Sequence, residues 1–328
     1  MYVNIKRENK KLIISHIADV DGLGAVILAK VHFGDIDYCL VDYSELDEAM
    51  EELVKSGTYH KYDEIFVTDL SLRQGSIDLI EGNEELKSKI KHFDHHLSEV
   101  NQGGKYPFVN VQYTDEDGKL VCGTTMFYKH IEKDFKYKSE YLDKFLEGVR
   151  SHDTMGPLGS SKYGNDLTTL SCLIKKEDFI EKFVKGIKAK EDSMTLDDKM
   201  IIDGENQRVK NYIDSCDKTL VRIDLDGHRV GVSISESYRS SVGSELSKKY
   251  YDDLDYILII NFMRRQFSFR TVRDDVDVGQ IAKHFCSSGG GQPKAAGMPI
   301  NSDTLFILDL VRDALIKEEY TRKMIQKN

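Results

Sequence analysis

The first half of the chain is built from short apolar runs that end in acidic or histidine residues. Runs of this kind begin at Leu12 and Ile65, a third ends at Phe93, and helical patterns fill the stretches between them through about residue 185. Apolar runs of this length, separated by helical patterns, are typical of buried strands in a parallel sheet. The sequence therefore predicts an α/β fold whose first domain is a doubly wound parallel sheet.

The residues that follow these runs predict a divided metal site. Ligands of doubly wound sheets collect beyond the carboxyl ends of the strands, where the chain places Asp19, Asp21, Asp69, Asp94, His95 and His96. One Asp at a strand end is more commonly a turn residue or a helix cap. Several together repel one another unless cations neutralise them, so the joint pattern indicates metal binding. Mixed Asp and His ligation favours a borderline divalent ion such as Mn2+. Mg2+, Zn2+ and Fe2+ are the alternatives.

Two further segments carry candidate residues. Segment 141–150 has apolar residues at helical spacing, and Asp153 lies one turn beyond Val149, so this helix could carry Asp153 back to the cluster. The triple glycine Gly289–Gly291 would let backbone amides approach a phosphate, although such a run is more commonly a flexible turn. Positive charge gathers in the C-terminal half near these glycines, at Arg264, Arg265, Arg270, Arg273 and Lys294. Arg264, Arg265 and Arg273 are more simply solvated charges at strand edges, whereas Arg270 lies in segment 266–272, which has the pattern of a strand.

These motifs resemble those of the DHH phosphoesterases, a family named for the triplet that is Asp94-His95-His96 in this chain. The family's first motif is similar to His16 followed by Asp19-Val20-Asp21-Gly22, its second to Asp69 and its fourth to Asp153, in the same order along the chain. Its DHHA1 substrate-binding domain ends in a glycine-rich loop similar to 289–297. Segments 41–43, 122–128 and 149–154 are most similar to the oligoribonuclease branch called nanoRNase B.

The resemblance implies a two-metal mechanism with assigned residues. One ion would be held by His16, Asp19 and Asp69, and the other by Asp21, Asp69, His95 and Asp153, so that Asp69 is the bridge. His96 would donate a hydrogen bond to the phosphate or the leaving oxygen, and Asp94 would orient a neighbouring histidine. The substrate's terminal nucleotide would be bound by Arg270, Gly289, Gly290, Gly291, Gln292 and Lys294.

Two positions depart from the family pattern. Gln292 stands where the family's glycine loop usually has a histidine, and glutamine can exchange hydrogen bonds but cannot become a cation. The spacing from His16 to Asp19 differs by one residue from common forms of the first motif. We therefore expect phosphate contact to survive at Gln292 with altered strength or pH dependence.

Length, charge and cysteine content limit the possible domain number, nucleic-acid partners and cellular location. At 328 residues the chain exceeds the usual size of one hydrophobic core, so we expect a catalytic domain at 1–189, a helical connector at 190–220 and a smaller α/β domain with a mixed sheet at 221–328. A net charge of -10 argues against binding long duplex nucleic acid, but not against short oligonucleotides. Five scattered cysteines, no signal-peptide pattern and no bilayer-length apolar run favour a cytoplasmic protein.

The function that these observations favour is a metal-dependent exonuclease that hydrolyses short RNA oligonucleotides to mononucleotides. Phosphatase action on 3'-phosphoadenosine 5'-phosphate and cleavage of linear or cyclic dinucleotides are close alternatives, since the same metal site serves all three. Inorganic pyrophosphatase and a long single-strand DNA exonuclease fit less well. A degenerate nucleic-acid-binding protein is disfavoured because every acidic motif position is still a carboxylate. Self-association into a homodimer is left open.

Overall fold

The protein is described by a computed structural model that covers residues 2–4, 11–96 and 104–325. Its contacts divide the chain into two compact units, Met1–Asp203 and Gly204–Asn328. The division falls inside the long helix α9 (Leu196–Lys218), which overlaps the connector expected at 190–220. The domain boundaries at 189 and 221 remain predictions.

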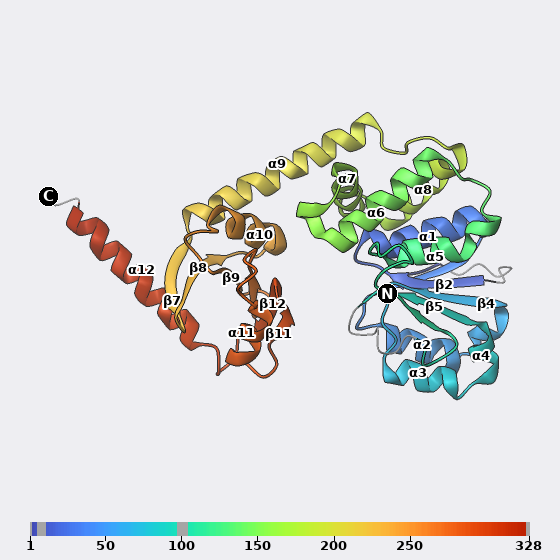
Figure 1. Ribbon diagram of the computed structural model, residues 1–328, viewed down its shortest axis with the longest axis horizontal. Coiled ribbons are helices and arrows are strands. Elements are labelled where there is room, and N and C mark those ends of the chain that lie inside the picture. The colour runs from blue at the N-terminus through green and yellow to red at the C-terminus, as the bar shows by residue number, and fades with distance from the viewer. Residues whose placement is uncertain (1, 5–10, 97–103, 326–328) are drawn as a thin grey trace. The chain divides into compact units, whose positions relative to one another are not determined.

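The first unit is a doubly wound sheet, which confirms the predicted α/β class (Figure 1). Its strand order is β1-β3-β2-β4-β5-β6, and every neighbouring pair is parallel except β1 with β3 at one edge. The strands are β1 (Tyr2–Asn4), β2 (Lys11–His16), β3 (Asp37–Val41), β4 (Glu64–Thr68), β5 (Ile90–Asp94) and β6 (Val109–Val111). The helices are α1 (Val20–Phe33), α2 (Leu46–Lys55), α3 (Gln74–Glu81), α4 (Glu84–Lys89), α5 (Gly123–Ile131), α6 (Glu140–Gly159), α7 (Lys162–Leu173) and α8 (Lys176–Ala189), with short 3-10 turns at Thr58–Lys61 and Glu132–Asp134.

Both faces of this sheet are buried. Ile13 and Phe66 pack with α1, α5, α6, α7 and α8, whereas their neighbours Ile14 and Val67 pack with α2, α3 and α4 on the opposite face (Figure 1). Strand residues alternate between faces, so a strand covered on both sides is apolar along its whole length. This is why the runs that begin at Leu12 and Ile65 show no polar alternation.

The chain order places a topological switch point at β2. After β2 the chain passes through α1 to β3 on one side, and then returns to β4 on the other side. The carboxyl ends of β2, β4 and β5 therefore meet at the edge where doubly wound sheets bind their ligands.

The second unit is an α/β domain with a mixed sheet, as the sequence predicts, and helices pack on both faces of the sheet. Its strand order is β11-β12-β10-β9-β8-β7, with β8 and β9 parallel and the other neighbours antiparallel. The strands are β7 (Val221–Leu225), β8 (His228–Ile234), β9 (Tyr256–Asn261), β10 (Gln266–Arg270), β11 (Gly290–Gln292) and β12 (Ala295–Pro299), and the helices are α10 (Arg239–Lys249), α11 (Val278–Phe285) and α12 (Phe306–Ile325).

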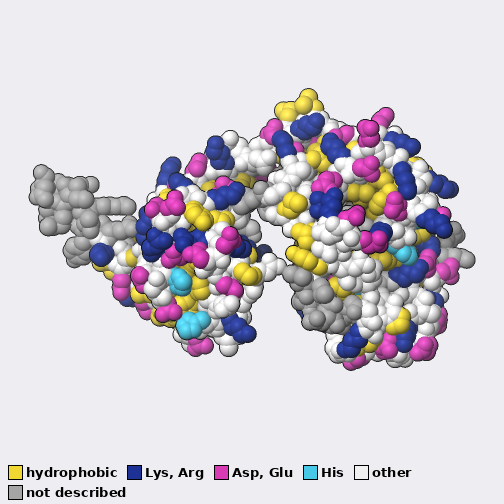
Figure 2. All heavy atoms as spheres, viewed as in Figure 1, with side chains coloured by type: hydrophobic (Ala, Val, Ile, Leu, Met, Phe, Trp, Pro, Cys, Tyr) yellow, Lys and Arg dark blue, Asp and Glu magenta, His cyan; other side chains and the backbone are white. Residues whose placement is uncertain are grey.

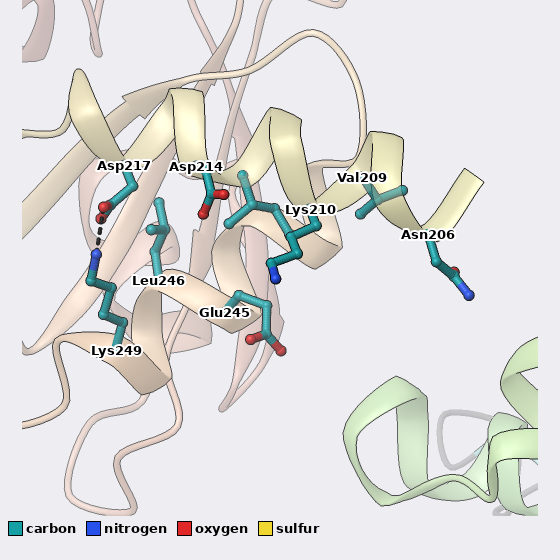
Figure 3. A pocket seen from close by; sticks show the side chains of 9 residues that line it. Asn206, Val209, Lys210, Asp214, Asp217, Glu245, Leu246 and Lys249 are labelled. Carbon is teal, nitrogen blue, oxygen red and sulfur yellow. Dashed lines mark hydrogen bonds and ion pairs between the residues drawn. The ribbon is translucent and has the colours of Figure 1, made fainter. Parts of the chain in front are cut away.

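Helix α9 packs beside α10 on one face of this sheet. A surface groove runs between the two helices, and Figure 3 shows its charged side chains with the ion pair of Lys249 and Asp217 at one end. Over the face of each unit that Figure 2 shows, Lys and Arg side chains are interspersed with Asp and Glu side chains. No helix in the described part of the chain is long and apolar enough to cross a membrane.

Candidate metal centre

The turn from β2 to α1 supplies the first candidate ligands. His16 is the last residue of β2, and Asp19 caps α1 by accepting hydrogen bonds from the amides of Asp21 and Gly22, each at 3.1 Å. The other Asp19 oxygen lies 2.8 Å from His16 Nδ1. A Cβ atom on Gly22 would lie 2.1 Å from the His16 carbonyl oxygen, so only glycine lets the helix begin this close to the strand.

Asp69 follows β4 and lies at the bottom of the site with 1% of its surface exposed. Its backbone φ of 54° is in the left-handed region, which Asp tolerates better than most residues. One carboxylate oxygen, Oδ2, is 3.6 Å from His16 Nδ1 and has no hydrogen-bond partner among the described residues. His16, Asp19 and Asp69 can offer ligand atoms within 4.8 Å of one another.

His95 brings three carboxylates to one point. Its Nε2 lies 3.3 Å from Asp153 Oδ2, 3.4 Å from Asp69 Oδ1 and 3.8 Å from Asp21 Oδ2. Asp153 comes from α6, whose helix carries it to the strand ends. Neither His95 Nε2 nor Asp153 Oδ2 has a hydrogen-bond partner in the described chain, although both atoms are buried. Buried polar atoms are rarely left without partners, so these atoms are arranged for a ligand.

Asp94 orients the histidines that follow it. Its Oδ1 accepts hydrogen bonds from the His95 amide at 2.9 Å and from His96 Nδ1 at 2.6 Å, while Oδ2 accepts one from the Ser71 hydroxyl at 2.9 Å. His96 Nε2 then lies 2.9 Å from the Tyr43 hydroxyl. The Tyr43 ring also packs against the His16 ring at 4.2 Å. Tyr43 was not among the residues that the sequence predicted for the site.

Asp21 is held by a segment that the sequence analysis did not assign to the site. Its two carboxylate oxygens accept hydrogen bonds from the amides of Gly123 and Thr124 at the start of α5, at 2.7 and 2.8 Å. A Cβ on Gly123 would lie 2.8 Å from the Asp69 Cβ. The Gly-Thr pair that opens α5 thus fixes Asp21 in place and leaves room for Asp69.

The charges of the cluster shift its pKa values strongly. Burial, together with the charges of Asp19 and Asp21, raises the pKa of Asp69 well above its usual range. Burial and the charge of Asp21 likewise raise the pKa of Asp153 to about 9, although His95 opposes this. Burial lowers the pKa of His16, but hydrogen bonds and charges from Asp19 and Asp69 outweigh it and raise that pKa to about 10. A divalent cation would relieve the repulsion between these carboxylates.

The donor set fits divalent cations. The two predicted ligand sets, His16, Asp19 and Asp69 on one side and Asp21, Asp69, His95 and Asp153 on the other, are each brought together by the fold. Cys122 also lies beside Asp21 and Asp153. Burial raises the pKa of its thiol well above the usual value, so it stays protonated and is a poor ligand. The acidic residues and the histidines, rather than this cysteine, are the candidate ligands.

The family comparison agrees with this geometry. Residues 10–149 match the model of the DHH family, N-terminal domain. This part of the chain therefore forms a DHH-family N-terminal domain. Oligoribonuclease NrnB of Bacillus subtilis (strain 168) is 29% identical to this DHH protein over 303 residues, which are 90% of this chain and 74% of the relative.

Two solved structures share the fold of this DHH protein at low sequence identity. The pGpG-specific phosphodiesterase PggH of Vibrio cholerae aligns with a TM-score of 0.56 and 14% identity, over 94% of this chain and 98% of the other. Exonuclease RecJ bound to manganese aligns with a TM-score of 0.57 and 12% identity, over 94% of this chain and 90% of the other.

The predicted substrate-binding residues of this DHH protein lie in the second unit. Arg270 on β10 and Gln292 on β11 are both paired with Ala295 of β12. Directly paired residues of antiparallel strands point to the same face, so Arg270 and Gln292 share a face two strands apart, at roughly 10 Å. Their role in binding stays a prediction.

The glycine run is not a free loop. Gly290 and Gly291 lie in the short strand β11 with φ values of 157° and 149°, and a Cβ on Gly291 would lie 2.5 Å from the Ala295 carbonyl oxygen. Gly289 is similarly close to the Ala282 carbonyl oxygen, at 2.3 Å. Lys294 donates hydrogen bonds to the Arg273 carbonyl and to Asp274. An anion bound by Lys294 would compete with that carboxylate.

Proposed function

We propose that this DHH protein is a metal-dependent phosphodiesterase that hydrolyses short RNA oligonucleotides to mononucleotides. The observation that carries the proposal is a cluster in which His95 Nε2 lies 3.3 Å from Asp153 Oδ2 and 3.4 Å from Asp69 Oδ1. Within the described residues, His95 Nε2, Asp153 Oδ2 and the second Asp69 oxygen, Oδ2, are buried without a hydrogen-bond partner. The similarity to Oligoribonuclease NrnB over 90% of the chain supports the substrate class. Retention of every acidic motif residue supports an enzyme rather than a degenerate binding protein.

Two divalent cations, with Mn2+ favoured, complete the proposed site. When bound, they would supply Lewis-acid stabilisation of the phosphate and a nucleophilic water at neutral pH. His16, Asp19 and Asp69 would hold one cation, and Asp21, His95 and Asp153 would share the other with Asp69. The structure of RecJ bound to manganese, which has the same fold, supports the choice of Mn2+.

The remaining residues of the site orient protons and side chains. Asp94 accepts from His96 Nδ1 and thereby fixes the ring so that Nε2 faces Tyr43. Burial and the charge of Asp69 raise the pKa of Tyr43, so its hydroxyl remains a neutral donor. His96 and Tyr43 together provide hydrogen-bonding groups beside the cluster, suited to the phosphate or to the departing oxygen.

A second candidate is a phosphodiesterase specific for linear dinucleotides. The observation that favours it is the fold shared with the pGpG-specific phosphodiesterase PggH, over nearly the whole of both chains. Both candidates use the same metal chemistry and differ in the length of the substrate.

The deciding experiment is Mn2+-dependent hydrolysis of end-labelled RNAs of graded length, from dinucleotides upward. It is run beside a linear diadenylate, 3'-phosphoadenosine 5'-phosphate and pyrophosphate. We expect stepwise release of mononucleotides across the RNA ladder. Activity confined to dinucleotides would move the assignment to the second candidate. Activity on 3'-phosphoadenosine 5'-phosphate alone would make the protein a phosphatase. No hydrolysis with any metal would refute an enzymatic role.

Tyr43→Phe tests the contact with His96. Removing the hydroxyl leaves the ring packing against His16 intact but frees His96 Nε2, so we expect kcat to fall by about 10- to 100-fold with little change in KM. Steady-state kinetics on a short RNA measure the effect. The exposed Tyr113→Phe serves as the matched control, since Tyr113 is 43% exposed. A rise in KM with unchanged kcat would show that Tyr43 binds substrate instead of positioning His96.

A further inference from the structure

Arginines of this protein fall into two groups according to whether they have an acidic partner. Several form ion pairs with carboxylates: Arg73, Arg150, Arg208, Arg229, Arg273 and Arg312. Five arginines of the second unit form no ion pair within the described residues: Arg222, whose guanidinium lies over the Tyr250 ring, and the neighbouring Arg239, Arg264, Arg265 and Arg270. In a chain with a net charge of -10, where carboxylates are plentiful, four neighbouring arginines without one are a specific feature.

Arg239 and Arg270 lie along one face of β10, and Arg264 and Arg265 lie in the turn that precedes this strand. Gln266, Ser268 and Arg270 alternate along the strand and point to the same face. Arg239, the first residue of α10, donates from Nη1 to Gln266 Oε1 at 3.0 Å, and Arg270 Nη2 donates to the Ser240 hydroxyl at 3.2 Å. Helix α10 therefore adds a second guanidinium beside the strand.

Two glycines leave room for these polar side chains. A Cβ on Gly243 would lie 2.5 Å from Arg270 Cγ, and a Cβ on Gly297 would lie 2.9 Å from Gln266 Nε2. Any other residue at either position would push against a side chain of this row. The backbone is thus shaped around Arg270 and Gln266, as expected for groups that are held in place.

The guanidinium groups repel one another and are partly desolvated. Burial lowers the pKa of Arg270, and the charge of Arg239 adds to this. Burial and the charge of Arg264 lower the pKa of Arg239, while Glu236 opposes the shift. Glu236 itself accepts hydrogen bonds from the amides of Phe262 and Met263. Partly buried cations without a counterion are costly, which points to an anion that is bound in function.

The row continues past Gln266 into an open groove of about 420 Å³, whose lining includes Arg264, Arg265, Gln266 and Gly297. Gln266 and Arg270 are four residues apart, which corresponds to roughly 13 Å along a strand. The positive groups therefore extend along the strand instead of surrounding one point. A row of this kind suits a chain of anions better than a single anion.

We propose that Arg239 and Arg264 extend the substrate site beyond Arg270 into a track that binds successive backbone phosphates of a single-stranded oligonucleotide longer than a dinucleotide. This inference rests on the proposed function and adds to it the residues that select substrate length. Guanidinium groups bind phosphates with two parallel hydrogen bonds, which suits this role.

Kinetics over RNA length test the track. Arg264→Gln is expected to raise KM about 10-fold for tetranucleotides and longer RNAs and to leave KM for dinucleotides unchanged, with kcat unaltered, because one charge-assisted phosphate contact is lost. Arg239→Gln is expected to raise KM from trinucleotides upward, and Arg239→Lys to recover part of the loss. Arg312→Gln, which removes an exposed, ion-paired arginine of α12, is the control and should match the parent protein at every length.

A binding measurement separates failure of the track from failure of the proposed function. Anisotropy of labelled RNA on the Asp69→Asn protein gives Kd without turnover, and Arg239→Gln in that background should reduce the slope of log Kd against log salt by about 1. Equal Kd values for the two proteins, or equal effects on dinucleotides and longer RNAs, would overturn the track. Binding of inorganic polyphosphate in preference to RNA would overturn its assignment to oligonucleotides.

Discussion

Replacing Asp69 with Asn is expected to lower kcat/KM for short RNA by at least about 1000-fold, equivalent to roughly 4 kcal/mol of transition-state stabilisation. Among the described residues, Asp69 is the one carboxylate that lies within 4 Å of both His16 and His95, so its loss removes a candidate ligand from both halves of the cluster. Asn tolerates the left-handed backbone of this position as Asp does. Steady-state kinetics with saturating Mn2+ measure the loss.

The same substitution is expected to stabilise the metal-free protein. The folded-state pKa of Asp69 is raised above its unfolded value, so at neutral pH this residue costs folding free energy; the cost shrinks as pH falls below the folded pKa and is gone below the unfolded pKa. Asn removes this cost, and each kcal/mol recovered corresponds to roughly 2–4 °C in Tm. If Asp69→Asn loses activity but has a higher Tm than the parent protein in chelator, the loss is a functional effect and not a result of unfolding.

Asp226→Asn is the matched control for this experiment. Asp226 has the same φ of 54°, but its side chain is exposed and belongs to the second unit. This variant should keep the parent activity and Tm. If Asp69→Asn retained even a tenth of the parent activity under these conditions, a bridging role for Asp69 would be untenable.

The part of the site that the sequence predicts is the part that depends on strand ends. Asp69 follows β4 and Asp94 ends β5, and parallel strands bring their carboxyl ends to one edge, so recognising the two strands in the sequence is enough to place these residues together. His92, by contrast, lies inside a strand and not at its end, so the same pattern predicts that it is structural. It lies within β5, is buried, and donates to the Leu70 carbonyl at 2.8 Å, in agreement with the structural role of a residue inside a strand.

Other site contacts join segments without a shared pattern. Gly123 and Thr124 bind Asp21 across about a hundred residues of sequence, and nothing in the spacing of either segment encodes this contact. Tyr43 lies two residues after β3, and the strand-end pattern points to acidic and histidine residues rather than to a tyrosine. A Gly-Thr-Thr start of a helix is a weak local signal for amides that bind a carboxylate, and only the packing of α5 against α1 gives it meaning.

The second unit shows where composition misleads. Three glycines in a row predict a flexible turn, whereas Gly290 and Gly291 form a strand paired with β12. Without side chains there is no alternation from which a strand could be recognised. The glycines are needed instead because Ala282 and Ala295 carbonyl oxygens approach within a distance that excludes a Cβ.

Metal binding is expected to raise the Tm of the first unit by roughly 5–10 °C. A cation present at 100 times its Kd stabilises the folded state by about 2.7 kcal/mol, and a unit of this size gains roughly 2–4 °C per kcal/mol. The stabilisation follows from the buried carboxylates, whose mutual repulsion a divalent cation removes. Calorimetry of the parent protein in chelator and in Mn2+ measures the shift.

The two units provide an internal control for this measurement, because each has its own hydrophobic cores. Only the transition of the first unit should move with Mn2+, since the cluster lies wholly within it. Asp153→Asn should reduce the shift, because it removes one of the three carboxylates that face His95. If Mn2+ raised the Tm of the parent and Asp153→Asn proteins equally, the bound metal would lie outside this cluster. That result would also contradict a catalytic role for the strand-end carboxylates.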